Sequence, residues 1–233
     1  MKLTIPFTGG PIEIELEIEE GVHHPGEAVI ERLQSIEIIG GNAALDLGCG
    51  CGIYGIFAAK AGCSEVTLTD VCPDAVSTAT ANAALNGLSN TKCLLGDFFE
   101  PVAGQHFDII FANMPQTPAP QPIRLDKWGG LEGTQFLSQL GIQSPDHLKP
   151  GGSLYFLHIG LANPTAVNDL FPQSFELEVV RQTDRHFQPG EYESYQPGLF
   201  QYLTDLREAG RAEFERAGDG WCFQTRFIRA TRR

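Results

Sequence analysis

The sequence predicts an α/β protein whose mostly parallel β-sheet is covered by helices on both faces. From residue 43 onward, short apolar segments typical of buried strands alternate with helical segments. A stretch of alternating apolar and acidic residues precedes them, and the last two strand segments lie where they can pair antiparallel. Because each β-α-β connection packs its helix against the sheet, this alternation favours a sheet buried between helical layers.

The first 21 residues are expected to form a β-hairpin. Residues 11–20, PIEIELEIEE, alternate isoleucine or leucine with glutamate, which is the period of a strand with one solvent-exposed face. Residues 3–7 supply a second strand, and Gly9 and Gly10 supply the turn between them. After the hairpin, residues 25–35 have the apolar spacing of a helix.

The remaining elements follow in alternation. The expected strands are 43–47, 65–70, 91–95, 107–112, 153–158, 175–182 and 221–230. The expected helices are 53–61, 73–86, 131–147, 164–169 and 199–217, with a short turn at 98–103. Residues 188–198, QPGEYESYQPG, are expected to be an ordered loop. Loops of this length often carry function, so we expect the insertion 188–220 to contribute to a substrate site.

The length of the chain predicts one domain, residues 1–233. The protein is expected in the cytoplasm. No apolar run is long enough to span a membrane, and MKLTIPFTGG lacks the features of a signal peptide. The six cysteines lie in surroundings that favour buried free thiols. Cys49 and Cys51 have no second pair to complete a tetrahedral site, so no metal is expected.

The net charge of −13 disfavours nucleic acid as a partner, because such a surface repels phosphate. Arginines 226, 229, 232 and 233 are a local exception near the end of the chain. They are interpreted as the solvated ends of a strand and its tail, with a basic docking patch as the alternative.

A glycine-rich loop, GCGCGIYG, follows the expected strand 43–47. Glycines at 48, 50 and 52 allow a sharp turn and close approach to a ligand, which also meets the N-terminus of the next helix. The formal GxGxxG match begins at Gly50, but its register does not fit a dinucleotide site, since Ile53 occupies the third glycine position counted from Gly48.

Three acidic residues lie at the ends of successive expected strands: Asp46, Asp70 and Asp97. Ligands of open α/β sheets bind beyond the carboxyl ends of the strands, so these carboxylates are expected to converge on one crevice. A carboxylate at the end of the second strand can accept both hydroxyls of a ribose. One after the third strand can accept the amino group of a purine.

In order and spacing, six segments resemble the class I S-adenosylmethionine-dependent methyltransferases: ALDLGCGCGIYGI, TLTD, ATANAALNGL, LLGDFFEP, FDIIFANMP and LKPGGSLYF. The resemblance covers about residues 22–160. It implies a Rossmann-like, seven-stranded sheet with a reversed C-terminal hairpin, and S-adenosyl-L-methionine as cofactor. It also implies cofactor contacts for the methionine part at Asp46, Gly48, Cys49, Gly50 and Gly52, for the ribose at Asp70, and for the adenine at Asp97 and Phe98. Val71, next to Asp70, is a further expected cofactor contact.

Asn113, Met114, Pro115 and Gln116 resemble the Asn-Pro-Pro-Tyr motif of nitrogen-directed methyltransferases. In that motif the asparagine oxygen and the next backbone carbonyl accept hydrogen bonds from the substrate nitrogen. The resemblance therefore implies a catalytic role for Asn113, Met114 and Pro115, and places Asn113 beside the cofactor. The alternative is that Asn113 caps a loop. Gln116 stands where the motif has an aromatic residue, so Trp128 or Tyr192 is expected to stack on the acceptor, or the acceptor is a different nitrogen.

Two further segments resemble the glutamine-modifying, release-factor type of enzyme, within the "methyltransferase small" branch. DKWGGLEG, residues 126–133, resembles a Gly-Gly-x-Asp-Gly segment, with Glu132 replacing the aspartate. HHPGE, residues 23–27, resembles a segment over the active site, in which His24 and Glu27 are expected to contact substrate. A polar loop is the alternative for His23 and His24.

The sequence thus predicts an enzyme that transfers a methyl group from S-adenosyl-L-methionine to a nitrogen of a small metabolite or peptide. A protein glutamine or ribosomal-protein N-methyltransferase is the main alternative. An RNA base methyltransferase and a non-catalytic cofactor-binding subunit rank below it. The sequence leaves open whether the enzyme has a protein partner or forms a homodimer.

Overall fold

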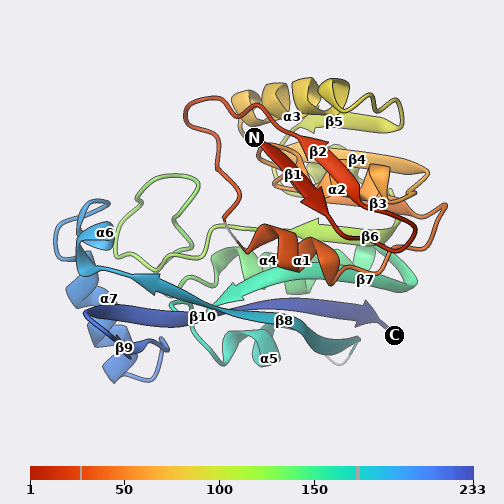
Figure 1. Cartoon of the computed structure of the whole chain (residues 1–233). Helices are drawn as coiled ribbons and strands as arrows, with labels where there is room; N and C mark the ends of the chain where they lie inside the picture. Colours follow the sequence, from red (N-terminus) through yellow and green to blue (C-terminus); the bar gives the residue numbers. More distant parts are fainter. Residues whose placement is uncertain (27, 172–173) are drawn as a thin grey trace. The chain divides into compact units, whose positions relative to one another are not determined.

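A computed structural model describes residues 1–26, 28–171 and 174–233. Its larger sheet has the strand order β5-β4-β3-β6-β7-β10-β8, with β9 added beside β10, and its smaller sheet pairs β1 with β2 (Figure 1). The chain divides into two compact units. The first contains 1–113, 145–156 and 229–233, and the second contains 114–144 and 157–228. Strands β7 and β10 run through both.

The first unit contains the parallel core of the sheet. Its strands are β3 (Ala43–Leu47), β4 (Glu65–Asp70), β5 (Thr91–Leu95), β6 (Phe107–Ala112) and the first part of β7 (Leu148–Ile159). β3 pairs in parallel with β4 and β6, and its last four residues are buried. Helix α2 (Ile53–Lys60) is buried along seven of its eight residues. The central strand and this helix are therefore buried along most of their length, as expected for a sheet covered on both faces.

Helix α3 (Pro73–Leu85) lies between β4 and β5 in the chain, and asparagines at its C-terminal end bond residues 15 and 17, at the end of the hairpin of the first unit. The hairpin strands β1 (Lys2–Ile5) and β2 (Ile12–Glu15) pair antiparallel, which confirms the expected N-terminal hairpin. The Asn86 amide follows α3 and bonds the backbone of Glu15 at both its N–H (3.1 Å) and its carbonyl (2.6 Å). One side chain thus completes the backbone hydrogen bonding of a strand end. The first unit also contains α1 (Val29–Gln34).

The second unit contains the end of β7, β8 (Phe175–Phe187), β9 (Glu215–Ala217) and most of β10 (Gly220–Arg232). Its helices are α4 (Gln135–Gln143), α5 (Ala166–Leu170), α6 (Pro189–Glu193) and α7 (Leu199–Glu208). Figure 1 shows β8 and β10 running in opposite directions, which is the reversed C-terminal hairpin. An aromatic cluster forms the core of this unit, with Phe187 in contact with Tyr192, Phe200, Phe214 and Phe223.

The expected helix 199–217 is wrong in its second half, because α7 ends at Glu208. Gly210 adopts a φ of +71°, and the Arg211 N–H bonds the Leu206 carbonyl at 2.8 Å, a glycine C-terminal cap. The chain then returns as β9. Conversely, the expected loop 188–198 begins with helix α6, where Pro189 takes the first helical position.

The arginines near the C-terminus lie mainly on β10, as the strand interpretation predicted. Arg226 pairs with Glu213, and Arg229 pairs with Glu37. Arg232 donates to the carbonyl of Leu148. Among the described residues, no helix has the length and apolar composition needed to cross a membrane.

Candidate functional site

The glycine-rich loop is anchored to the end of β4. The N–H groups of Gly48 and Cys49 both donate to the Thr69 carbonyl, at 2.8 and 2.9 Å. Gly50 has a φ of +52°, a conformation that glycine adopts without strain, and nothing lies within 4 Å of the position a Cβ would take. Gly52 caps α2 with a φ of +83°. The loop therefore exposes its backbone at Gly50 directly before the N-terminus of a buried helix.

Asp46 is buried beneath this loop. Its side chain is 3% exposed, and one carboxylate oxygen accepts the N–H of Gly55 at 2.8 Å. Burial raises the pKa of Asp46 to about 8; the Gly55 hydrogen bond opposes this rise, and the charge of Asp70 adds to it. The carboxyl is therefore largely protonated near neutral pH in the protein alone. A bound cationic ligand would favour its ionised form.

Replacing Asp46 by Asn should remove a pH dependence of stability. The pKa in the folded state, about 8, lies above the unfolded value of about 3.9, so protonation favours the fold. This contribution is complete below about pH 4 and lost as pH rises to about 8. Relative to Asp46→Asn, the free energy of unfolding of the wild type should fall by up to ~1.4 kcal/mol per pH unit across that window. Urea titrations without cofactor measure it, and parallel pH profiles for the two proteins would contradict it.

Asp70 ends β4 and is held in place by two backbone donors. Its two carboxylate oxygens accept the N–H groups of Gly50 and Cys72, both at 2.9 Å. A carboxylate has about four acceptor positions, so both oxygens can still accept from hydroxyl groups. Beside it, Val71 is 52% exposed, and Leu95, the register partner of Asp70 on β5, is 56% exposed. This pairing of a fixed acid with apolar surface suits a ligand with both hydroxyl groups and a flat apolar ring.

Asp97 and Phe98 follow β5. Asp97 is exposed, and its carbonyl accepts the N–H of Glu100 at 3.0 Å. Phe98 has a φ of +49°, which is costly for a bulky side chain. Its ring packs edge to face on that of Phe99, with the two ring centroids 4.9 Å apart. Backbone strain of this kind often occurs at ligand sites.

Asn113 and Pro115 bracket a half-buried turn after β6. Within the described part of the chain, no hydrogen bond engages the Asn113 side chain. Asn113 is the last residue of this stretch in the first unit, and Met114 begins the second. The amide of Asn113 is thus free to bind a ligand at the carboxyl end of a core strand.

Gln116, in the second unit, is 4% exposed and bonded to β7 through both ends of its amide. Its nitrogen donates to the Leu157 carbonyl at 2.5 Å, and its oxygen accepts the Ile159 N–H at 3.2 Å. Between these two partners lies His158, a buried residue that the sequence analysis did not single out. Burial lowers the pKa of His158 to about 4, so the ring is neutral near neutral pH.

The segment after Gln116 folds back on itself. Thr117 forms a parallel bridge with Trp128, whose indole donates to the Ala119 carbonyl at 3.2 Å. Glu132 accepts a 2.8 Å hydrogen bond from the Asn163 amide and pairs with Arg211. The glutamate that replaces the family's aspartate is therefore tied to two other parts of the second unit.

Gly129 and Gly190 offer a matched test of this packing. A Cβ on Gly129 would lie 2.6 Å from the Gln116 Cα and 2.9 Å from the Gly133 Cα, whereas one on Gly190 would meet nothing within 4 Å. We expect Gly129→Ala to destabilise the protein by ~1–3 kcal/mol, since backbone must move. Gly190→Ala should change stability by less than ~1 kcal/mol. Denaturant unfolding measures both; equal effects would contradict the close packing.

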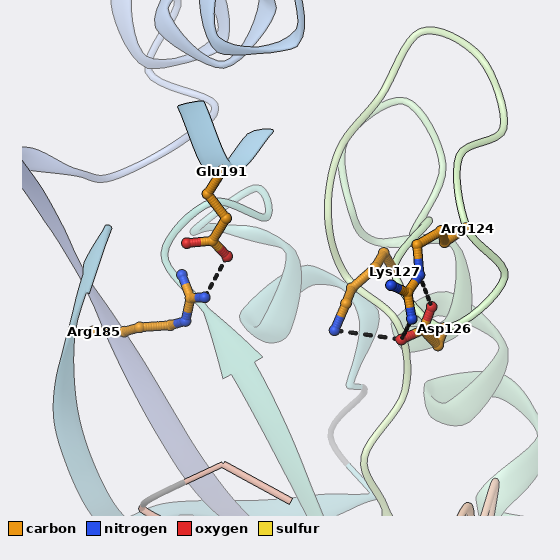
Figure 2. Close-up of polar contacts among 5 residues, drawn as sticks. All are labelled: Arg124, Asp126, Lys127, Arg185 and Glu191. Atoms are coloured by element: carbon orange, nitrogen blue, oxygen red, sulfur yellow. Dashed lines mark hydrogen bonds and ion pairs between the residues drawn. The ribbon is translucent and has the colours of Figure 1, made fainter. Parts of the chain in front are cut away.

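Figure 2 shows two groups of charged residues of the second unit, Arg185 with Glu191 and Asp126 with Arg124 and Lys127. Arg185 pairs with Glu191 at 2.5 Å, and Asp126 pairs with Arg124 at 2.9 Å and with Lys127 at 3.4 Å. Tyr195 lies within electrostatic reach of both groups; burial raises its pKa, Glu191 raises it further, and Arg185 and Arg124 lower it.

The other sequence candidates differ in exposure. Tyr192 is 3% exposed and packs edge to face on Phe187, while Trp128 is half-buried. His24 is exposed in the segment before α1, and Glu27 lies outside the described residues. Leu95 and His158 were not singled out from sequence. Leu95 ends the expected strand 91–95, and His158 ends the expected strand 153–158. Their positions at strand ends could have indicated both residues.

A parallel sheet with a glycine loop and acids at its strand ends defines a class of nucleotide-cofactor enzymes, and comparison with known proteins identifies which class. Residues 23–186 match the methyltransferase small domain family, and the chain belongs to that family. A protein of Methanocaldococcus jannaschii, provisionally named protein N5-glutamine methyltransferase, is 31% identical over 173 residues, covering 71% of this chain and 87% of its own length.

Other relatives are longer than this chain. The release factor glutamine methyltransferase of Geobacter sulfurreducens is 31% identical over 146 residues, 57% of this chain and 50% of that protein. The chain thus spans about half the length of this relative. The solved structure of a precorrin-6y C5,15-methyltransferase from Geobacter metallireducens has a TM-score of 0.57 at 13% identity, covering 93% of this chain and 95% of its own, and confirms the fold.

The protein is an S-adenosylmethionine-dependent methyltransferase, and the residues of the first unit fit that cofactor. The open space beside Gly50 leaves room for a ligand against the backbone. The carboxylate of Asp70 can accept ribose hydroxyls, and the exposed side chains of Val71 and Leu95 provide apolar surface. When bound, the cofactor supplies an electrophilic methyl group on a sulfonium.

Proposed function

We propose that the protein methylates the side-chain amide nitrogen of glutamine in a protein or peptide. The observation that carries this proposal is Asn113, an amide at the carboxyl end of β6 with no hydrogen-bond partner among the described residues. The resemblance to the Asn-Pro-Pro-Tyr motif, the GGLEG segment and the names of the M. jannaschii and release-factor relatives support a glutamine acceptor.

Positioning is the main contribution of these residues. An amide nitrogen is a poor nucleophile because its lone pair is delocalised. The Asn113 side-chain oxygen and the Met114 carbonyl accept its two hydrogens, which aims the lone pair at the methyl group and stabilises the positive charge that develops on nitrogen. Asp46, the loop 48–52, Asp70, Val71, Asp97 and Phe98 bind the cofactor in this proposal.

Contacts with the acceptor complete the proposal. Trp128 provides an aromatic face in place of the residue lost at position 116, and the insertion 188–220 contributes to acceptor binding, with Tyr192 supporting it from the buried aromatic cluster. His24 contacts the acceptor as well, while Glu27, the other residue expected there from the sequence, lies outside the described residues. Residues 1–233 act together as one catalytic domain. Six free cysteines are typical of proteins in the reducing conditions of the cytoplasm, which is the location that we propose.

A small metabolite with an amine or amide nitrogen is the second candidate acceptor. Gln116 stands where an aromatic residue would stack on a planar group, and its amide is committed to β7. The negative net charge disfavours RNA as an acceptor.

Labelled methyl transfer tests the proposal. The protein is incubated with methyl-labelled S-adenosylmethionine and a peptide containing one glutamine, with the same peptide carrying glutamate as the matched control. Label on the glutamine peptide alone, located by fragmentation to the side-chain nitrogen, supports the proposal. Label on both peptides, or only on small amines offered in parallel, would overturn the glutamine assignment.

A further inference from the structure

We infer that Gln116 is a positioning residue whose side chain replaces a strand residue beside β7 and thereby fixes the Met114–Pro115 turn. The inference rests on the proposed role of that turn in holding the acceptor nitrogen. It concerns the position where the chain departs from the Asn-Pro-Pro-Tyr pattern, and it gives that departure a physical purpose.

The register of the sheet shows what the Gln116 amide replaces. β6 pairs with β7 in parallel as far as Ala112, which lies opposite Phe156. In a continuing ladder, residue 114 would lie opposite His158 and would bond the carbonyl of Leu157 and the N–H of Ile159. These are the two groups that the Gln116 side chain bonds, at 2.5 and 3.2 Å.

This substitution releases three residues from the ladder. Two steps along β7 separate Phe156 from His158, whereas four steps of chain separate Ala112 from Gln116. Residues 113–115 therefore bulge out of the sheet, and the β7 groups that would have bonded the backbone of residue 114 are satisfied by an amide side chain. The Met114 carbonyl can then face a ligand without leaving a buried backbone group unpaired.

The backbone of Gln116 is held as firmly as its side chain. A Cβ on Gly133 would lie 2.3 Å from the Gln116 carbonyl oxygen, and one on Gly129 would lie 2.6 Å from its Cα. Gln116 is thus enclosed by the GGLEG segment on one side and bonded to β7 on the other. With 4% of its surface exposed, it acts on the acceptor through the turn rather than by contact.

The two departures from the family motif compensate each other. Met114 stands where proline would fix φ, so the turn loses a local constraint. The hydrogen bonds of Gln116 supply a tertiary constraint two residues later. An error of about 1 Å in the position of a catalytic acceptor can cost on the order of 100-fold in rate, so the replacement constraint matters for turnover.

The experiment compares Gln116→Ala with Asn86→Ala in the full chain. Asn86 is the matched control because its amide also bonds a backbone N–H and carbonyl, both of Glu15, in the N-terminal hairpin. We expect Gln116→Ala to lower kcat for the glutamine peptide by ~10–100-fold with S-adenosylhomocysteine affinity within about twofold of wild type. Asn86→Ala should change stability and leave kcat unchanged. A kcat loss no larger for Gln116→Ala than for Asn86→Ala overturns the inference.

A rescue variant separates positioning from general destabilisation. Adding Met114→Pro to Gln116→Ala restores the local constraint on φ and should recover part of the lost kcat. If Met114→Pro alone is active but the double variant recovers none of the lost kcat, the proposed compensation is overturned.

Hydrogen exchange gives a readout that needs no acceptor. The amides of residues 113, 114, 116 and 117 should exchange faster in Gln116→Ala than in Asn86→Ala or the wild type. Unchanged exchange there overturns the inference whatever the acceptor is, whereas a wild type that fails to methylate glutamine while exchange does increase overturns only the proposed function.

Discussion

Replacing Asn113 by Ala should lower turnover by about 100-fold while leaving cofactor affinity nearly unchanged. The variant removes an oxygen that, in the proposed mechanism, accepts a hydrogen from the acceptor nitrogen at the carboxyl end of β6. Because the Asn113 side chain has no hydrogen-bond partner in the described structure, little stability should be lost with it. Single-turnover rates and calorimetry with S-adenosylhomocysteine measure the two effects separately.

Asn90→Ala is the control for this prediction. Asn90 is similarly half-buried in the first unit, but its amide donates to the Cys63 carbonyl at 2.8 Å before β5 begins. It should retain wild-type turnover. An Asn113→Ala variant with undiminished turnover would remove the basis of the proposed mechanism, and a wild type that binds cofactor without transferring methyl groups would favour a non-catalytic binding subunit.

Replacing Asp70 by Ala should weaken S-adenosylhomocysteine binding by about 100-fold or more. Two effects combine: the ribose loses a charged acceptor, for which each hydrogen bond contributes ~1.5–3 kcal/mol, and the N–H groups of Gly50 and Cys72 lose the carboxylate that orders them. Asp70→Asn keeps one oxygen acceptor and should lie between the two. Calorimetry measures the dissociation constants.

Asp74→Ala controls for the loss of a negative charge near the same loop. Asp74 is exposed in the first turn of α3, four residues after Asp70. Its replacement should change the affinity by less than about threefold, since exposed charges interact weakly through solvent. Equal losses for Asp70→Ala and Asp74→Ala would mean that net charge, and not the held carboxylate, governs binding.

The sequence by itself determined the parallel strands of the sheet and predicted the cofactor side of the site. Strands 43–47, 65–70, 91–95 and 107–112 were predicted with the observed bounds. Their apolar runs end at glycines, acids or Asn113, and Gly50 and Gly52 have the positive φ values that glycine adopts without strain. Local patterns of this kind carry their own physical cause, because strand period and glycine φ are properties of short segments.

Only the tertiary structure showed the contacts of Gln116 and the pairing of β9. The Gln116 amide bonds residues 41 and 43 positions away, and its enclosure depends on glycines of a later segment. From sequence, Gln116 could be described only as a missing aromatic residue. Likewise, residues 209–217 have helical spacing, but α7 ends at Glu208 and residues 215–217 pair with β10 as β9. Gly210 is a local signal for the end of the helix. Hydrogen bonds between distant segments outweigh local propensity, so no local pattern could have predicted the contacts of Gln116 or the pairing of β9.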